Sequence, residues 1–168
     1  YLSTSYAKSI PESAEIAEQD NVDAYKNKKA ILYGMIVVKN ENDKYGVKNL
    51  SNNTIIGEKY KSILFDEEEQ EFIVETDEGK FGILDSAGNR KISTDYTSIK
   101  LISKDRGLYL VSKTSGASKT QYGIINKNER VIVYIEYEQI GINKSDFPTN
   151  DIENPYILFG KCIPVKRS

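Results

Sequence analysis

One pattern occurs three times in this 168-residue chain, and it constrains the fold more than any other feature. Each copy opens with an aromatic residue followed by glycine and closes with a tyrosine 15 residues after that aromatic; an isoleucine follows three residues later. The copies run from Tyr45 to Tyr60, from Phe81 to Tyr96 and from Tyr122 to Tyr137. Self-similarity in constant register is typical of repeat proteins, in which each unit buries its apolar face against its neighbours. The sequence therefore predicts a tandem repeat fold.

Short apolar segments and polar turns alternate within each copy. Residues 31–38 are apolar and rich in β-branched side chains, residues 40–43 have turn-forming side chains, and a second strand is expected from Tyr45. The same order recurs around Phe81 and Tyr122, and residues 155–163 resemble the first strand of a further copy. We therefore expect an all-β domain over residues 30–168. Its units would be antiparallel and three-stranded, arranged as a curved array or a partly closed barrel.

The first 29 residues differ from the repeats. A Ser/Thr-rich linker precedes a segment at residues 11–18 that begins with Pro11 and contains several acids. Proline and carboxylates are favourable in the first turn of a helix, and Ser9 is a suitable N-cap. We predict a linker and a short helix within residues 1–29. Since the chain begins with Tyr1 and not with Met, we expect it to be part of a larger protein.

The repeated positions are interpreted as structural. The opening aromatics and the closing tyrosines are expected to pack against one another in the core. The glycines that follow the opening aromatics allow a bulge or the close approach of another backbone. Asn49, Asp85 and Asn126 end these strands and can close a turn with their side chains. The signature residues are Tyr45, Gly46, Tyr60, Phe81, Gly82, Tyr96, Tyr122, Gly123 and Tyr137.

Composition argues against several classes of function. The formal net charge of −2 does not favour a general binder of nucleic acids. With no histidine and only Cys162, the usual zinc sites and the Ser-His and Cys-His catalytic pairs cannot be formed. Gly-rich phosphate loops and dinucleotide motifs are missing. We expect no cofactor, no metal site and no catalytic residue, and the sequence identifies no binding residue.

The densest group of charges comprises residues 66–69 and Glu71, all of them acidic. Clustered carboxylates are ligands that calcium prefers. Five acids this close in sequence are more typical of a solvated connection between strands. Both interpretations remain open at the level of sequence, with the connection favoured.

The segment 80–90, Lys-Phe-Gly-Ile-Leu-Asp-Ser-Ala-Gly-Asn-Arg, together with Tyr96, resembles the WG (KWG) repeat family of bacterial proteins. Units of that family begin with Lys-Trp-Gly, pass through an Asp-x-x-Gly turn and close on Tyr. The resemblance covers about residues 31–163, with Tyr45, Phe81 and Tyr122 in place of Trp. It implies a β-repeat fold and non-catalytic binding or scaffolding roles, often in surface or envelope-associated proteins.

Three functional hypotheses follow. The first is a non-enzymatic protein-interaction or scaffold module of a larger bacterial, envelope-associated protein, with another protein as partner or with self-association through edge strands. The second is a carbohydrate or cell-wall binding module that uses surface tyrosines. The third is a small hydrolase that acts through paired carboxylates. The resemblance points to an extracytoplasmic or cell-surface location, with membrane contact only through an anchor upstream of this sequence.

Overall fold

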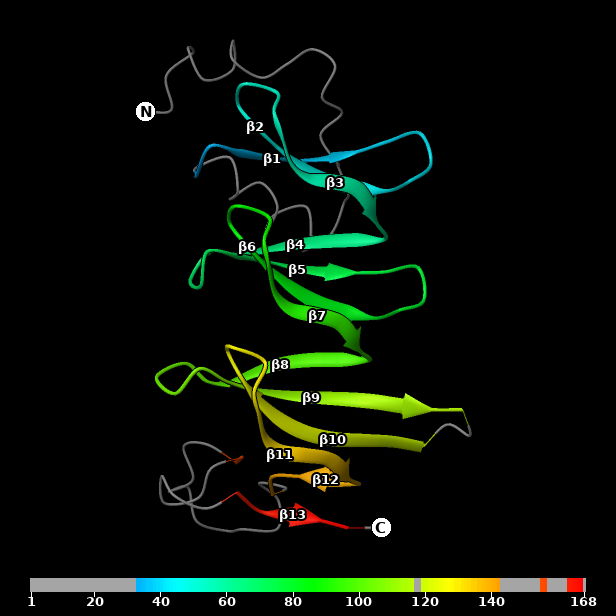
Figure 1. Ribbon diagram of the computed structural model, residues 1–168, viewed down its shortest axis with the longest axis vertical. Helices are drawn as coiled ribbons and strands as arrows, with labels where there is room; N and C mark the ends of the chain where they lie inside the picture. Colours follow the sequence, from blue (N-terminus) through cyan, green and yellow to red (C-terminus); the bar gives the residue numbers. More distant parts are fainter. Residues whose placement is uncertain (1–32, 117–118, 143–154, 157–162, 168) are drawn as a thin grey trace. The chain divides into compact units, whose positions relative to one another are not determined.

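The computed structural model describes residues 33–116, 119–142, 155–156 and 163–167 (Figure 1). Its regular elements are antiparallel β-strands, which confirms the predicted all-β class. The helix predicted at residues 11–18 lies outside the described residues. The chain divides into two compact units, Tyr1–Thr94 and Asp95–Ser168.

The described strands form four sheets, in each of which strands that are consecutive in sequence are neighbours. The first sheet contains β1 (Met35–Lys39), β2 (Tyr45–Asn49) and β3 (Thr54–Tyr60). The second contains β4 (Ser62–Asp66), β5 (Glu71–Glu75), β6 (Phe81–Asp85) and β7 (Arg90–Tyr96). The third contains β8 (Ser98–Ser103), β9 (Leu108–Ser115), β10 (Lys119–Asn126) and β11 (Val131–Tyr137), and the fourth contains β12 (Gln139–Ile140) and β13 (Val165–Lys166).

The predicted three-stranded unit is wrong for the second and third sheets, which have four strands each. The additional strands, β4 and β8, follow the closing tyrosines after a single residue. No turn is formed there. Instead, the amide of that residue donates a hydrogen bond to the next sheet, from Lys61 N to Glu75 O at 2.8 Å and from Thr97 N to Ser112 O at 2.8 Å. Because the chain passes from one sheet to the next without a turn, β4 and β8 could not be predicted from turn signals.

The first and the last predicted strands are displaced. The strand expected over residues 31–38 begins at Met35, because Gly34 has a φ of +75°, which an extended strand does not accommodate. In the segment predicted as a strand at 155–163, Pro155 and Tyr156 form a turn, and residues 157–162 lie outside the described part. The strand of this region is β13, which begins only at Val165.

Each unit has its own apolar core. In the first unit, side chains of the first and second sheets form one cluster around Phe72 and Val47, both of which are fully buried. In the second unit, Ile102, Leu108, Ile124 and Ile140 form the centre of another cluster. The alternation of buried and half-buried residues along β4 and β5 reflects the two faces of a pleated strand.

The three signature glycines occupy places where a side chain would collide with backbone. A Cβ atom at Gly46 would lie 2.6 Å from Ile56 O, one at Gly82 would lie 2.9 Å from Ile92 O, and one at Gly123 would lie 2.7 Å from Val133 O. In every copy the carbonyl belongs to the residue ten positions after the glycine. The pairing register shifts beside Gly46 and beside Gly123, as in a β-bulge. The close approach that the sequence predicted at these glycines is confirmed.

The turn that joins the aromatic-glycine strand to the closing strand is built in the same way in all three copies. A side-chain oxygen at its first position accepts hydrogen bonds from the amides two and four residues later, at 2.8–3.0 Å. Its fourth residue has a φ of +64°, +83° or +60°. The predicted closure by side chains is thus confirmed. The turns are residues 49–53, 85–89 and 126–130.

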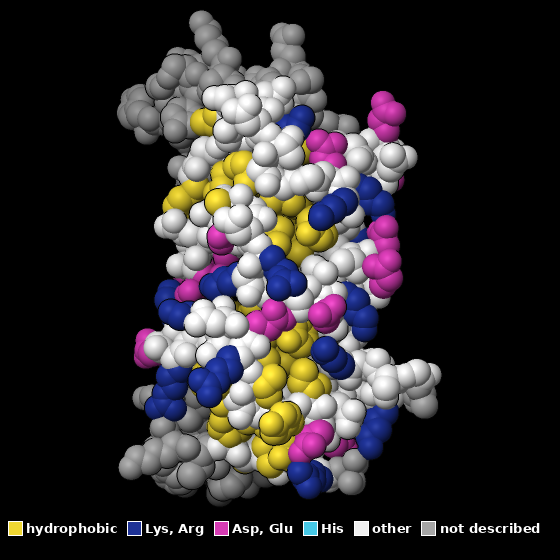
Figure 2. All heavy atoms as spheres, viewed as in Figure 1, with side chains coloured by type: hydrophobic (Ala, Val, Ile, Leu, Met, Phe, Trp, Pro, Cys, Tyr) yellow, Lys and Arg dark blue, Asp and Glu magenta, His cyan; other side chains and the backbone are white. Residues whose placement is uncertain are grey.

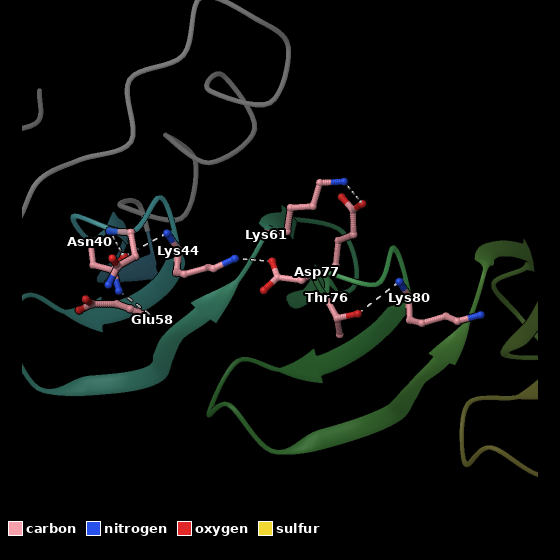
Figure 3. Close-up of polar contacts among 9 residues, drawn as sticks. Asn40, Lys44, Glu58, Lys61, Thr76, Asp77 and Lys80 are labelled. Carbon is pink, nitrogen blue, oxygen red and sulfur yellow. Dashed lines mark hydrogen bonds and ion pairs between the residues drawn. The ribbon is translucent and has the colours of Figure 1, made fainter.

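A tight fit explains why the middle copy has glycine at the fourth turn position. A Cβ atom at Gly88 would lie 2.4 Å from Ile55 O, so this turn of the second sheet is in contact with β3 of the first. Figure 3 shows a second link within this unit, the ion pair between Lys44 in the β1–β2 turn and Asp77 in the β5–β6 turn. Both links join residues that are more than 30 positions apart in the sequence.

Replacing Gly46 by alanine should lower the free energy of unfolding by about 2 kcal/mol or more, because the new methyl group collides with the Ile56 carbonyl. Gly57→Ala is the matched control in the same sheet, since no heavy atom lies within 4 Å of a Cβ there. Urea denaturation followed by circular dichroism measures both variants. Equal stabilities of the two variants would contradict the proposed steric role of Gly46.

Replacing Asp85 by alanine should cost about 1–2 kcal/mol, because two turn amides lose their acceptor. Asp85→Asn should be nearly neutral at pH 7, since asparagine occupies this position in the other two copies. Burial alone would raise the pKa of Asp85, but hydrogen bonds from Asn89, Ala87 and Gly88 outweigh it and hold the pKa below its usual value.

Because the pKa of Asp85 is lowered in the folded state, its ionised form stabilises the fold. The carboxylate contributes stability above about pH 4, and this contribution is lost as the pH falls through the folded-state pKa. The wild type should therefore lose stability relative to Asp85→Asn in acid. A constant difference between pH 7 and pH 3 would argue against this role for the carboxylate.

Candidate interaction surface

The opening aromatics and closing tyrosines lie on adjacent strands. Tyr45 and Tyr60 are directly opposite one another on β2 and β3, and both are buried. Tyr122 and Tyr137 are likewise opposite on β10 and β11, and both are half-buried at the edge of the second core cluster. These rings pack against protein, so their faces are not presented together as a stacking surface for a sugar.

The middle copy has the most constrained tyrosine. Phe81 is half-buried, whereas Tyr96 is buried, and its hydroxyl donates a hydrogen bond to Glu129 Oε1 at 3.2 Å. Lys113 Nζ lies 5.1 Å from the centroid of the Tyr96 ring. Burial, followed by the charge of Glu129, raises the pKa of Tyr96 to about 12. The tyrosine thus connects the end of β7 to the turn at residues 126–130.

Replacing Tyr96 by phenylalanine should lower stability by about 1 kcal/mol near pH 8, through loss of the hydrogen bond to Glu129. In the wild type, the unfolded tyrosine releases its proton near pH 10 but the folded one only near pH 12, so stability falls as the pH rises between these values. The advantage of the wild type should therefore disappear on this interval. Denaturant titrations at several alkaline pH values would refute the assignment if the difference stayed constant.

The acidic run forms the connection between β4 and β5. Asp66 Oδ1 accepts hydrogen bonds from the amides of Glu68 and Glu69 at 3.0 and 3.2 Å, and Asp66 lies opposite Glu71 in the ladder. Glu71 is buried and forms an ion pair with Lys91. In the described part of the chain, no three Asp, Glu, Cys or His side chains are grouped as a metal would require. The acids act here in a turn and in an ion pair.

Surface charges of both signs are interspersed. Figure 2 shows lysine and arginine side chains together with aspartate and glutamate side chains on the visible face. Lys61 Nζ contacts Glu75 Oε1 at 2.8 Å, and Lys39 Nζ contacts Asp43 Oδ1 at 2.9 Å. The hydrogen bond to Glu75 raises the pKa of Lys61. Exposed pairs of this kind contribute little to stability.

The two strands of the fourth sheet have the same register as the first two strands of the second and third sheets. The isoleucine three residues after each closing tyrosine pairs with a valine. The amide before the first strand also bonds to the second strand in each case, and the third example is Glu138 N to Lys166 O at 2.9 Å. β12 and β13 thus correspond to β4–β5 and to β8–β9. The pairs are Ile63–Val74, Ile99–Val111 and Ile140–Val165.

Beside this pair of strands, the second unit exposes large apolar side chains. Ile132 on β11 is 47% exposed and Val165 on β13 is 44% exposed, whereas Val74 and Val111, the counterparts of Val165, are fully buried. Tyr134 on β11 is 73% exposed. Val165 and Ile132 occupy positions that are covered in the first copy or in other sheets, and Tyr134 adds an exposed aromatic ring on the same strand as Ile132. Exposed apolar side chains of this kind indicate an interaction surface. We call Ile132, Tyr134 and Val165 the open-end surface.

None of these three residues is among those singled out by the sequence interpretation. The signal for β13 was present, since Ile163-Pro164-Val165-Lys166 resembles Ile36-Val37-Val38-Lys39 of β1. The strand was instead expected at residues 155–163, because that segment matches the strand that precedes each opening aromatic. Nothing in the sequence distinguishes Ile132 from a core residue, because exposure depends on which neighbour is present.

Comparisons with protein-family models, with curated proteins and with solved structures found no match. Among the described residues, no helix has the length and apolar character needed to cross a membrane. The interpretation of this surface therefore depends on its own geometry.

Proposed function

We propose that this chain is a non-enzymatic protein-interaction or scaffold module built from tandem β repeats of the WG type. The repeated glycine contacts and turn hydrogen bonds support the proposal, because the same residues perform the same local tasks in each copy. The finer architecture belongs to the proposal as well. It comprises a curved array or partly closed barrel, with a short helix within residues 1–29.

The observation that carries the proposed function is the open-end surface. Residues of the repeat signature are used to pack the sheets, whereas Ile132, Tyr134 and Val165 present apolar area to solvent. Protein partners recognise patches in which aromatic and aliphatic side chains are surrounded by polar ones. Polar side chains of this kind are present on or directly beside the same two strands, since Arg167, two positions after Val165, forms an ion pair with Glu136, two positions after Tyr134.

The proposal includes a location at the bacterial cell surface, which rests only on the resemblance of residues 80–90 to the WG signature. The burial of Tyr45, Tyr60 and Tyr96 weighs against a sugar platform formed by the repeated rings. Protein recognition is therefore the function that we put first.

A pull-down tests this function. The folded chain is immobilised and challenged with envelope and soluble extracts of the source organism. The matched control is the double variant Ile132→Ser, Tyr134→Ser, whose substitutions lie at exposed positions and should leave the fold intact. We expect a specific protein to be retained by the wild type and about tenfold less by the variant, since exposed apolar and aromatic anchors dominate binding.

The contrary results are equally clear. Retention of wall glycans in place of protein would overturn the proposal in favour of carbohydrate binding. Equal retention by wild type and variant would exclude the open-end surface as the binding site.

A further inference from the structure

As far as the structure describes it, the fourth sheet shows the first half of the strand pattern found in the second and third sheets. In those sheets the second strand pairs on one side with the first strand and on the other side with an aromatic-glycine strand. Within the described residues, β13 pairs only with β12. The second and third sheets therefore show where a third and a fourth strand of the fourth sheet would lie.

The backbone of β13 is oriented to accept a further strand. Lys166 O and Pro164 O receive hydrogen bonds from Glu138 N and Gly141 N, so both carbonyls face β12. Because backbone groups alternate in direction along an antiparallel strand, the N–H and C=O of Val165 point to the opposite edge. Val74 and Val111 pair at the corresponding edge with Gly82 and Gly123.

A second observation, on β11, also points to positions for two further strands. Ile132 is the extra residue of the bulge between Val131 and Val133, and Ile55 is the corresponding residue of β3. Ile55 is half-buried and packs against the core, and Gly88 in the β6–β7 turn lies against its carbonyl. Ile132 is 47% exposed. By comparison with Ile55, a turn between a third and a fourth strand of the fourth sheet would cover Ile132.

We propose that the open-end surface binds a β-hairpin of this chain's own repeat type, supplied by another polypeptide segment, as the third and fourth strands of the fourth sheet. This inference deepens the proposed function and rests on it. The hairpin consists of an aromatic-Gly strand, an Asx turn and a strand that closes on tyrosine. Such strand addition at a sheet edge is a common mode of peptide recognition.

The register of the bound hairpin follows from the existing sheets. The glycine of the hairpin pairs with Val165, as Gly46, Gly82 and Gly123 pair with valines. Its aromatic residue pairs with Lys166, as Tyr45 pairs with Lys39. Its turn then covers Ile132. A single extended strand would reach Val165 but would leave Ile132 in water, which is why a hairpin is the better occupant.

The test uses a fluorescent peptide with the sequence of residues 80–97, closed by a disulfide between cysteines added at its two ends. Closure reduces the entropy lost on binding, since an isolated hairpin is marginally stable in water. The full 168-residue chain is titrated and fluorescence anisotropy is recorded. We expect saturable binding, and slower amide hydrogen exchange at Val165 in the complex.

Matched variants on both sides make the test specific. A peptide with Gly82→Val cannot form the close approach to the Ile92 carbonyl, so its affinity should fall about tenfold or more. On the chain, Val165→Asp and Ile132→Asp should each weaken binding about tenfold, because a carboxylate replaces buried apolar area. Both positions are exposed, so thermal unfolding of these variants should match that of the wild type.

Absence of peptide binding would overturn the inference, as would equal affinity of the Gly82→Val peptide or of the Val165→Asp chain. Self-association of the chain that the peptide does not displace would show that a second copy occupies the surface by another mode. Failure of the hairpin proposal can be distinguished from failure of the proposed interaction function. A protein retained equally by the wild type and by Val165→Asp would leave the interaction function intact while removing the hairpin as its basis.

Discussion

The approach of a carbonyl oxygen to each signature glycine is the constraint on which the sheets depend. At Gly46, Gly82 and Gly123 the space of a side chain is filled by the backbone of the closing strand ten residues later. This contact places the bulge, and the bulge brings the closing tyrosine opposite the opening aromatic in the first and third sheets. Larger residues at these positions would push the closing strand away and separate the aromatic pair.

The turns closed by Asx side chains also form contacts with residues outside their own hairpins. The Asx oxygens of residues 49, 85 and 126 hold their turns in one conformation, so that the fourth residue of each turn is presented in the same way. In the turn at residues 85–89 this residue is Gly88, and it lies against β3 of the first sheet. In the second unit it is Glu129, which accepts the hydrogen bond of Tyr96. In these two copies the turn therefore reverses the chain and also contacts a residue outside its own hairpin.

The functional proposals follow from the point at which this pattern stops among the described residues. β12 and β13 have the pairing of the first two strands of a sheet. Val165 and Ile132 are exposed, whereas the corresponding residues Val74 and Ile55 are buried and half-buried. The surface is therefore defined by comparison within one molecule. A partner that supplies the two further strands would bury these side chains and satisfy the outward backbone groups of Val165.

The sequence by itself determined the features that depend on near neighbours. The all-β class, the turns closed by Asn49, Asp85 and Asn126, and the need for glycine beside the aromatics all arise within about 15 residues, where steric fit and turn hydrogen bonds act. The tertiary structure alone decided the extra strands β4 and β8, the position of β13 and the exposure of Ile132. The position of β13 depends on the pairing of distant segments, such as Gln139 with Lys166, which no local pattern encodes. β4 and β8 were missed because the chain changes sheets at Lys61 and Thr97 without a turn.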